Sequence, residues 1–289
     1  MLEYVRAPDV AQAVAALAQA GDGGRPLAGG TDLIPQLREG RRRARLLVDV
    51  KMVPECRQLA VEDGHLVIGA AVPLADVAAD PAVRARHLML AEAAGLVGSW
   101  AIQNRASLGG NLGNAAPSAD TVPALICLGA EAEVAGPGGS RRLPVAALPA
   151  GPGRLNLLPG EFVVRFFIPD AAGAGAYLRF TPRAEMDIAV AGAGVLVSLG
   201  PDGVCQSARV ALSAVAPVPL LVPDAAAALV GTRLSDADLG QAAALAQAAC
   251  RPITDQRAAA DYRRHLVGVL VRRAGQLARQ RAREGRAQS

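Results

Sequence analysis

The sequence predicts a chain of mixed helices and strands folded as two packed units. Its 289 residues are more than one domain needs and leave room for two units with a sizeable core. Stretches with helical periodicity and stretches typical of strands are interleaved along its length. The small, flexible and proline-interrupted segment 169–175 is the best candidate for a boundary. We therefore divide the chain into residues 1–172 and 173–289.

The helices of the first unit are predicted from their start signals. Asp9 and Gln12 stand in the spacing of a capping box, directly before residues whose apolar side chains share one helical face. Thr31 or Asp32 can cap a second helix, which places Pro35 in its first turn, where a missing N–H costs least. The predicted helices of this unit cover residues 10–20, 32–39, 74–79, 83–96 and 120–128.

The strands of the first unit are short apolar stretches bounded by turn residues. Glu62, Asp63 and Gly64 separate two of these stretches, which is typical of a tight β-hairpin. One further segment, 99–118, is rich in Gly, Asn, Ser and Pro and is too long and too specific in composition for an ordinary turn. Strands are predicted over residues 46–50, 59–61, 65–69, 131–135 and 161–168.

The second unit is predicted to be a small antiparallel sheet followed by helices. The turn 200–203 separates strand-like stretches over 188–199 and 207–214, and a further stretch covers 177–180. Ser235 and Asp238 again have capping-box spacing. Helices are predicted over residues 223–230, 235–250 and 258–281. The Gly192-Ala193-Gly194 sequence lacks a third glycine and a helix start, and we interpret it as plain strand.

Composition and charge argue against a nucleic-acid-binding protein. The net charge is +4, but the arginines that carry it are spread along the chain. Aromatic residues make up 3% of the sequence, too few for platforms that stack single-stranded bases. The sequence shows no concentrated basic stripe and no element that would recognise nucleic-acid bases. Runs such as Arg41-Arg42-Arg43 are therefore interpreted as solvated surface.

Cysteine and histidine spacing excludes several classes of site. The four cysteines lie far apart without a C-x-x-C pair, which fits no iron–sulfur or zinc site and no disulfide framework. The three histidines are isolated, so we expect no metal bound by this chain. Uncharged apolar stretches are too short to span a membrane, and no secretory leader is expected. These features together indicate a cytoplasmic protein.

Two glycine loops carry the chemistry of the sequence. They read Ala28-Gly29-Gly30-Thr31-Asp32 and Ser107-Leu108-Gly109-Gly110-Asn111. Glycines without a Cβ allow backbone N–H groups to converge on an anion, and the hydroxyl residue adds a donor. In the first loop these donors meet the start of a helix, which favours negative charge. A lone Gly-Gly is usually a turn, whereas two such loops facing across a cleft would hold a pyrophosphate.

The two loops resemble the FAD-pyrophosphate loops of the flavoprotein subunits of molybdenum hydroxylases, the family of xanthine dehydrogenase and carbon monoxide dehydrogenase. The resemblance runs nearly end to end and keeps the order and spacing of the family motifs. Its stretches are Ala28 to Leu33, Ser107 to Asn111 continued by Asn114 to Asp120, Glu161 to Pro169, Arg183 to Ala189, and Arg263 to Leu266.

The resemblance implies an α+β, vanillyl-alcohol-oxidase-type FAD-binding domain plus a C-terminal domain with a small antiparallel sheet and helices. It implies that the loop residues contact the phosphates and ribitol of FAD, that Asp120 binds toward the ADP end, and that Val163 lies beside the isoalloxazine ring. Val97 stands where xanthine dehydrogenase has an aromatic residue, and Arg179 where the mammalian enzyme has a lysine near the flavin N1–C2 edge. The implied cofactor-binding residues are Ala28, Gly29, Gly30, Thr31, Asp32, Leu33, Val97, Ser107, Leu108, Gly109, Gly110, Asn111, Asp120, Val163 and Arg179.

The family's division of labour implies the role of this chain and its partners. A large subunit holds the molybdopterin cofactor and a small subunit carries two iron–sulfur clusters, in a dimer of heterotrimers. The flavin subunit delivers electrons to a final acceptor, so no catalytic acid or nucleophile is expected here. Two other hypotheses stay open: a stand-alone FAD oxidoreductase with its own substrate pocket, and a flavin-free scaffold in which the loops are turns.

Overall fold

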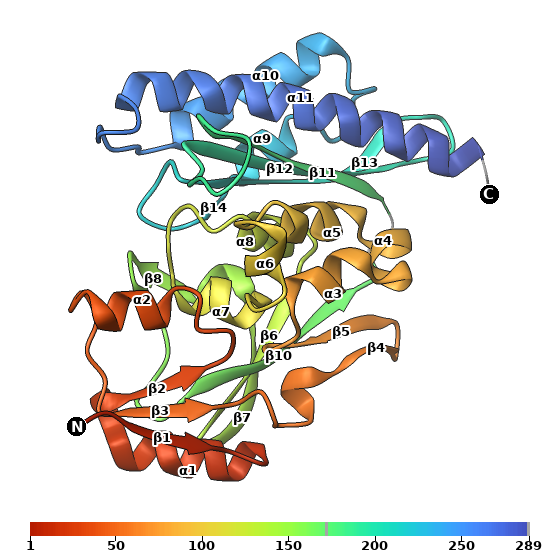
Figure 1. Cartoon of the computed structure of the whole chain (residues 1–289). Coiled ribbons are helices and arrows are strands. Elements are labelled where there is room, and N and C mark those ends of the chain that lie inside the picture. The colour runs from red at the N-terminus through yellow and green to blue at the C-terminus, as the bar shows by residue number, and fades with distance from the viewer. Residues whose placement is uncertain (171–172, 288–289) are drawn as a thin grey trace.

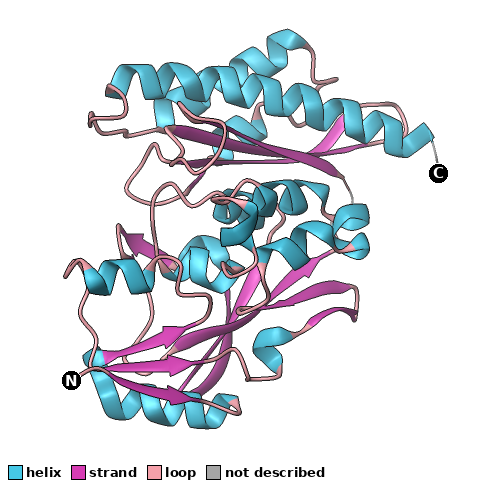
Figure 2. Cartoon of the chain, viewed as in Figure 1, coloured by secondary structure: helices cyan, strands magenta, loops and turns pink. Residues whose placement is uncertain are grey.

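The computed structural model describes residues 1–170 and 173–287, with side chains through residue 285. The chain forms two N-terminal sheets, a middle layer of helices, and a C-terminal sheet covered by helices on its outer face (Figures 1 and 2). The predicted boundary between residues 172 and 173 adjoins positions 171–172, which lie outside the described residues, and it stays a prediction. No described helix has the length and apolar character needed to cross a membrane.

The first sheet is parallel and has three strands in the order β1-β3-β2. Strand β3 (Leu46–Asp49) was predicted, whereas β1 (Glu3–Arg6) was not, because all four of its side chains are exposed and show no alternation. Strand β2 (Gly24–Leu27) completes the sheet and leads directly into the first glycine loop. Helix α1 (Val10–Ala20) packs on this sheet through buried Ala13 and Leu17.

The residues predicted to cap helices lie at helix starts, but not all of them form the expected cap hydrogen bonds. Asp9 caps α1 by accepting from the Gln12 amide at 2.7 Å, but the Gln12 side chain donates to the Asp9 carboxylate and not to its backbone. Asp32 occupies the cap position of α2 (Leu33–Arg38) without a side-chain cap bond, so this predicted cap is wrong. Ser235 and Asp238 form the predicted capping box at the start of α10 (Asp236–Ala249).

The second sheet is antiparallel and has five strands in the order β4-β5-β10-β6-β7. Its first hairpin pairs Leu59 with Ile68, as the turn residues predicted. The sheet carries the middle layer of helices on one face (Figure 1). Its strands are β4 (Leu59–Glu62), β5 (His65–Gly69), β6 (Glu131–Gly136), β7 (Gly139–Pro144) and β10 (Phe162–Pro169), and the short pair β8 (Pro149–Gly151) and β9 (Arg154–Leu155) lies beside it.

The middle layer differs from the sequence prediction in two places. The helix predicted over 83–96 is broken at His87, whose φ of −138° and ψ of 51° are not helical. The segment 99–118, expected to be irregular, contains two short helices. The helices of this layer are α3 (Leu74–Ala79), α4 (Pro81–Arg86), α5 (Leu88–Gly95), α6 (Trp100–Gln103), α7 (Leu108–Gly113) and α8 (Thr121–Cys127).

The C-terminal sheet has the strand order β11-β12-β13-β14 and is antiparallel, as predicted. Helices α10 and α11 cover its outer face, while α5 and α8 of the middle layer pack on the other face (Figure 1). The long last helix buries one face that includes Leu266 and Leu270. The elements are β11 (Ala174–Phe180), β12 (Ala191–Leu199), β13 (Cys205–Ser213), β14 (Leu220–Leu221), α9 (Pro223–Ala227), α10 and α11 (Ala260–Ala287).

Two glycines of β12 leave room for side chains that pack against the C-terminal sheet, Gly192 for two side chains of neighbouring strands and Gly194 for two of the middle layer. A Cβ on Gly192 would collide with the Tyr177 hydroxyl and with Ser213 Oγ. A Cβ on Gly194 would lie 2.9 Å from Met89 Cε and 3.2 Å from Cys127 Sγ. Both residues lie in a strand, as predicted, and their absent side chains are what admits these neighbours.

We expect Gly192→Ala to destabilise the fold by about 1–3 kcal/mol, because the new methyl group overpacks a fully buried site. Gly240→Ala is the matched control: Gly240 lies within α10, and a Cβ there meets nothing within 4 Å. Alanine should stabilise that helix by up to about 1 kcal/mol. Urea unfolding of both variants measures the difference; equal midpoints would contradict the packing argument.

Stability should depend on the protonation of His87. Its side chain is fully buried, both ring nitrogens lack a hydrogen-bond partner within the described part of the chain, and burial lowers its pKa despite Asp170 at 3.9 Å. Below about pH 6.5 the imidazole of His87 binds a proton more readily in the unfolded chain than in the folded chain. The free energy of unfolding therefore falls as the pH decreases further. His87→Leu should lose less stability between about pH 7.5 and about pH 5.5, measured by urea unfolding. Equal losses in both proteins would contradict this.

Candidate functional site

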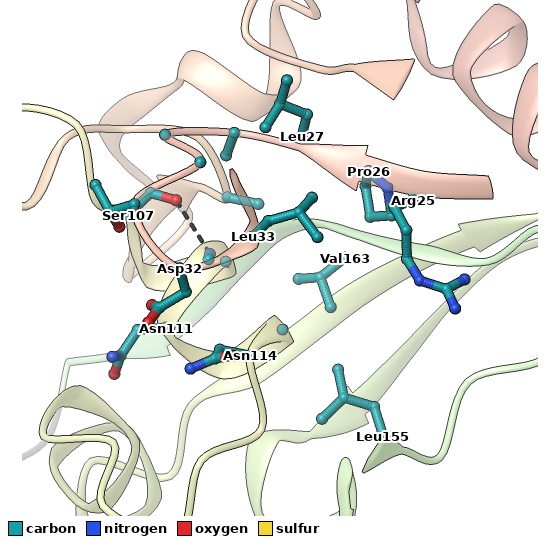
Figure 3. A pocket seen from close by; sticks show the side chains of 18 of the residues that line it. Arg25, Pro26, Leu27, Asp32, Leu33, Ser107, Asn111, Asn114, Leu155 and Val163 are labelled. Carbon is teal, nitrogen blue, oxygen red and sulfur yellow. Dashed lines mark hydrogen bonds between the residues drawn. The ribbon is translucent and has the colours of Figure 1, made fainter. Parts of the chain in front are cut away.

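A cavity of about 760 Å³ lies at the junction of the N-terminal sheets, the middle layer and the C-terminal unit. Both glycine loops line it, together with Phe162 and Val163 of β10 and the segment 186–188 beyond β11. In Figure 3, Asp32, Ser107 and Asn111 gather on one side of the cavity and Arg25, Pro26 and Val163 on the other. The volume is within the roughly 300–1,000 Å³ of pockets that hold organic ligands.

The first glycine loop presents backbone donors to this cavity. Gly29 packs directly against the carbonyl of Arg105, where a Cβ would overlap the oxygen. Gly30 has a φ of +73°, in the left-handed region that favours glycine. The amides of residues 29–32 donate no hydrogen bond to any described residue. These N–H groups are therefore available to an anion.

The second glycine loop is the first turn of α7 and lies in a segment for which no helix was predicted. Ser107 is the cap of this helix, and its Oγ accepts from the Gly110 amide at 3.1 Å. A Cβ on Gly109 would lie 2.5 Å from the Ala70 carbonyl oxygen, so Gly109 serves backbone packing. A Cβ on Gly110 would meet Ser107 Oγ alone, at 3.2 Å. Within the fold, Gly110 is therefore not required by packing against neighbouring elements.

The helices that follow the two loops are joined by a hydrogen bond. Gln36 of α2 donates from Nε2 to Asn114 Oδ1, directly after α7, at 2.9 Å. Both helices have six residues, so each has a weak macrodipole. The loops therefore offer individual N–H donors to a ligand and little net charge. Charge compensation for an anion has to come from side chains.

Asp120 belongs to a buried polar network that joins the cavity wall to the C-terminal sheet. Its carboxylate accepts from Tyr177 Oη at 2.8 Å and from Arg179 Nη1 at 2.5 Å. Tyr177 Oη also lies 3.0 Å from Ser213 Oγ. Burial raises the pKa of Asp120 against the opposing effects of Arg179 and Tyr177, and burial also raises the pKa of Tyr177. The network holds a carboxylate in a nearly dry position at the edge of the cavity.

The ion pair bears on two of the predicted assignments. Asp120 was expected at the ADP end of the cofactor and Arg179 at the flavin edge, but their side chains lie 2.5 Å apart. An extended dinucleotide cannot place its two ends at one ion pair, so at most one of the two assignments applies. Asp120 lines the cavity, whereas Arg179 is behind it and 5% exposed.

Most of the predicted cofactor-binding residues line this one cavity. The exceptions are Leu108, which is fully buried in the core, and Arg179. Sequence reasoning missed Arg25 and Arg42, which also line the cavity. Arg42 belongs to the basic run that was interpreted as surface; spacing gave no sign that it faces inward. The described residues include no cluster of His, Cys, Asp and Glu suited to a metal ion, and all four cysteines are free and buried.

Comparisons with known proteins agree along the whole chain. Residues 1–171 match the FAD binding domain in molybdopterin dehydrogenase, and residues 176–278 match the CO dehydrogenase flavoprotein C-terminal domain. The chain is 33% identical to the carbon monoxide dehydrogenase medium chain of Afipia carboxidovorans, covering 97% of each chain. It is 31% identical to a putative xanthine dehydrogenase FAD-binding subunit of Escherichia coli, covering 93% of each.

The fold comparison agrees with the sequence comparison. The solved structure of reconstituted CO dehydrogenase from Oligotropha carboxidovorans superposes with a TM-score of 0.94 at 32% identity, covering 98% of this chain and 99% of that chain. The cavity fits FAD by its own geometry: open N–H donors at the first loop, and an uncrowded position at Gly110 where a phosphate can approach the backbone.

Gly110→Val tests whether the second loop approaches the phosphates. The variant should fold, because a Cβ at this position meets no other element, but it should weaken FAD binding by at least about 100-fold, or roughly 2.7 kcal/mol. Titration of flavin-free protein with FAD gives the affinity. Gly138→Val, in an open turn outside the cavity lining, is the control. A folded Gly110→Val protein that retains stoichiometric FAD would exclude this loop from the site.

Proposed function

The chain belongs to the FAD-binding subunits of the molybdopterin dehydrogenases, and we propose that it transfers electrons from the iron–sulfur clusters of a partner to a terminal acceptor. The observation that carries this proposal is the convergence of both glycine loops on one cavity, in a chain that matches medium subunits over its full length. Bound FAD supplies hydride and single-electron chemistry. The chain's own residues bind the cofactor, orient it and limit its access to water.

The proposed contacts follow from the walls of the cavity. Ala28 to Leu33 would bind phosphate and ribitol through free amides, and Ser107 to Asn111 would bind beside them on the same wall. Val97 and Val163 would supply apolar surface beside the flavin ring. No side chain is assigned as a catalytic acid, base or nucleophile. This absence suits a subunit that accepts and delivers electrons without binding the organic substrate.

The proposed partners are a large molybdopterin-binding subunit and a small iron–sulfur subunit, assembled as a dimer of heterotrimers in the cytoplasm. Support comes from the relatives, which are named as medium chains and FAD-binding subunits of dehydrogenases. The substrate of the whole enzyme is set by residues on another chain. A stand-alone FAD oxidoreductase is the competing function, and the experiment below separates the two.

Purification from the native source tests the proposal. We expect the chain to elute as one complex with a molybdenum-containing subunit and an iron–sulfur subunit, with flavin, iron and molybdenum in the same fractions. Metal analysis and mass spectrometry of the complex provide the measurement. A yellow chain that elutes alone, without co-migrating iron or molybdenum, would support the stand-alone oxidoreductase. A colourless chain that takes up no FAD would exclude both functions.

A further inference from the structure

We infer that Arg25 and Arg42 form a cationic pair that binds the diphosphate-bearing ADP half of FAD and selects FAD over flavins without that half. The inference rests on the proposed FAD site and adds two residues to it. Both arginines line the cavity that holds the two glycine loops. They come from different elements, β2 and the segment that follows α2.

Each arginine is fixed by backbone carbonyls and not by carboxylates. Arg25 Nη1 donates to the carbonyls of Asp22 at 2.9 Å and Gly24 at 2.7 Å. Arg42 donates through its amide to the Gln36 carbonyl at 3.2 Å and through Nη2 to the Gly153 carbonyl at 3.4 Å. Figure 3 shows the Arg25 side chain extending along the cavity from β2. These bonds orient the guanidinium groups without neutralising them.

Neither arginine of this pair is held in an ion pair within the described part of the chain. Of the five carboxylates that line the cavity, Asp120, Glu161 and Asp187 are each paired with an arginine outside the lining, whereas Asp22 and Asp32 form no ion pair with any described residue. Among the residues that the structure describes, neither Arg25 nor Arg42 has a carboxylate within 4 Å. Burial and repulsion from Arg25 lower the pKa of Arg42, and Asp32 opposes them in part. An anion in the cavity would offset these effects further, because opposite charge favours the charged guanidinium.

The position of Arg42 relative to the first glycine loop points to a diphosphate. Arg42 interacts electrostatically with Asp32 of that loop and with Arg25 of β2, so its guanidinium lies near both. The loops provide N–H groups but little net charge, because both helices are short. A buried diphosphate needs opposite charge as well as donors. Arginine suits this ligand, since its planar fork binds phosphate oxygens in pairs.

Ligand binding to the flavin-free full chain tests the assignment. Arg42→Gln should weaken the binding of FAD and of ADP by roughly 10- to 100-fold, the loss expected for a charge-assisted hydrogen bond, and leave riboflavin binding unchanged. The salt dependence of FAD binding should also decrease, because one cation is lost. Arg43→Gln is the matched control, being an exposed arginine in the same segment outside the cavity lining.

Two further variants separate charge from folding. Arg42→Lys keeps the positive charge but lacks the planar guanidinium group. It should therefore bind FAD and ADP more tightly than Arg42→Gln does, but less tightly than the wild type. Arg25→Lys should retain more affinity than Arg25→Gln for the same reason. Circular dichroism and thermal unfolding of the flavin-free proteins identify any variant that fails to fold. Conservative replacement keeps the test valid even if the glutamine variants are unstable.

The outcomes distinguish this inference from the proposed function. A wild-type chain that binds no FAD overturns the proposed function itself. Normal FAD binding by wild type, with Arg42→Gln indistinguishable from Arg43→Gln, overturns the arginine assignment alone. Equal weakening of riboflavin and FAD also overturns it, because riboflavin has no phosphate. Selective weakening of FAD and ADP supports it.

Discussion

The cavity depends on a tight backbone contact between the first glycine loop and the residues just before the second. Gly29 lies against the Arg105 carbonyl with no space for a Cβ, so the end of β2 reaches the start of α7. Next to this contact the Ala106 carbonyl accepts from the Leu74 amide, and the Gly109 amide donates to Ala70. Loops distant in sequence thereby form one continuous wall of the pocket. Any larger residue at Gly29 would separate the two loops before it affected a ligand.

The buried network around Asp120 connects that pocket to the rest of the molecule. Tyr177 lies in β11 but packs in the core of the middle layer, and its hydroxyl bonds both Asp120 and Ser213. Removing one partner of a buried charged pair generally costs more than the pair contributes, because the other charge stays buried. The C-terminal sheet therefore fixes the geometry of a cavity formed mainly by N-terminal residues. Gly192 makes this possible by leaving room for both hydroxyl groups.

The sequence predicted well the elements that local signals such as caps and turns determine. It predicted less well the elements that tertiary contacts determine. Capping residues located α1 and α10, and the hairpin turn fixed β4 and β5. Strand β1 was missed because its exposed side chains show no strand pattern. Its pairing with β3, a tertiary contact, is what makes it a strand. The break at His87 has no proline or glycine to announce it. The order and spacing of the motifs identified the glycine loops. Arg42 was missed, because it lines the cavity through the path of the folded chain and belongs to no sequence motif.

The side chains along the cavity differ between its ends, and in the proposed binding mode this difference would give a dinucleotide one direction. Beside the C-terminal unit the acidic side chains are held in pairs, Asp120 with Arg179 and Asp187 with Arg183. At the β2 end Arg25 and Arg42 form no ion pair among the described residues, although Asp22 and Asp32 also line the cavity. Because the two guanidinium groups can donate to phosphate oxygens, a ligand with a diphosphate in one half would place that half near β2. The uncharged ring system would then face Val97, Met186 and Ile188, where an apolar wall meets the C-terminal unit.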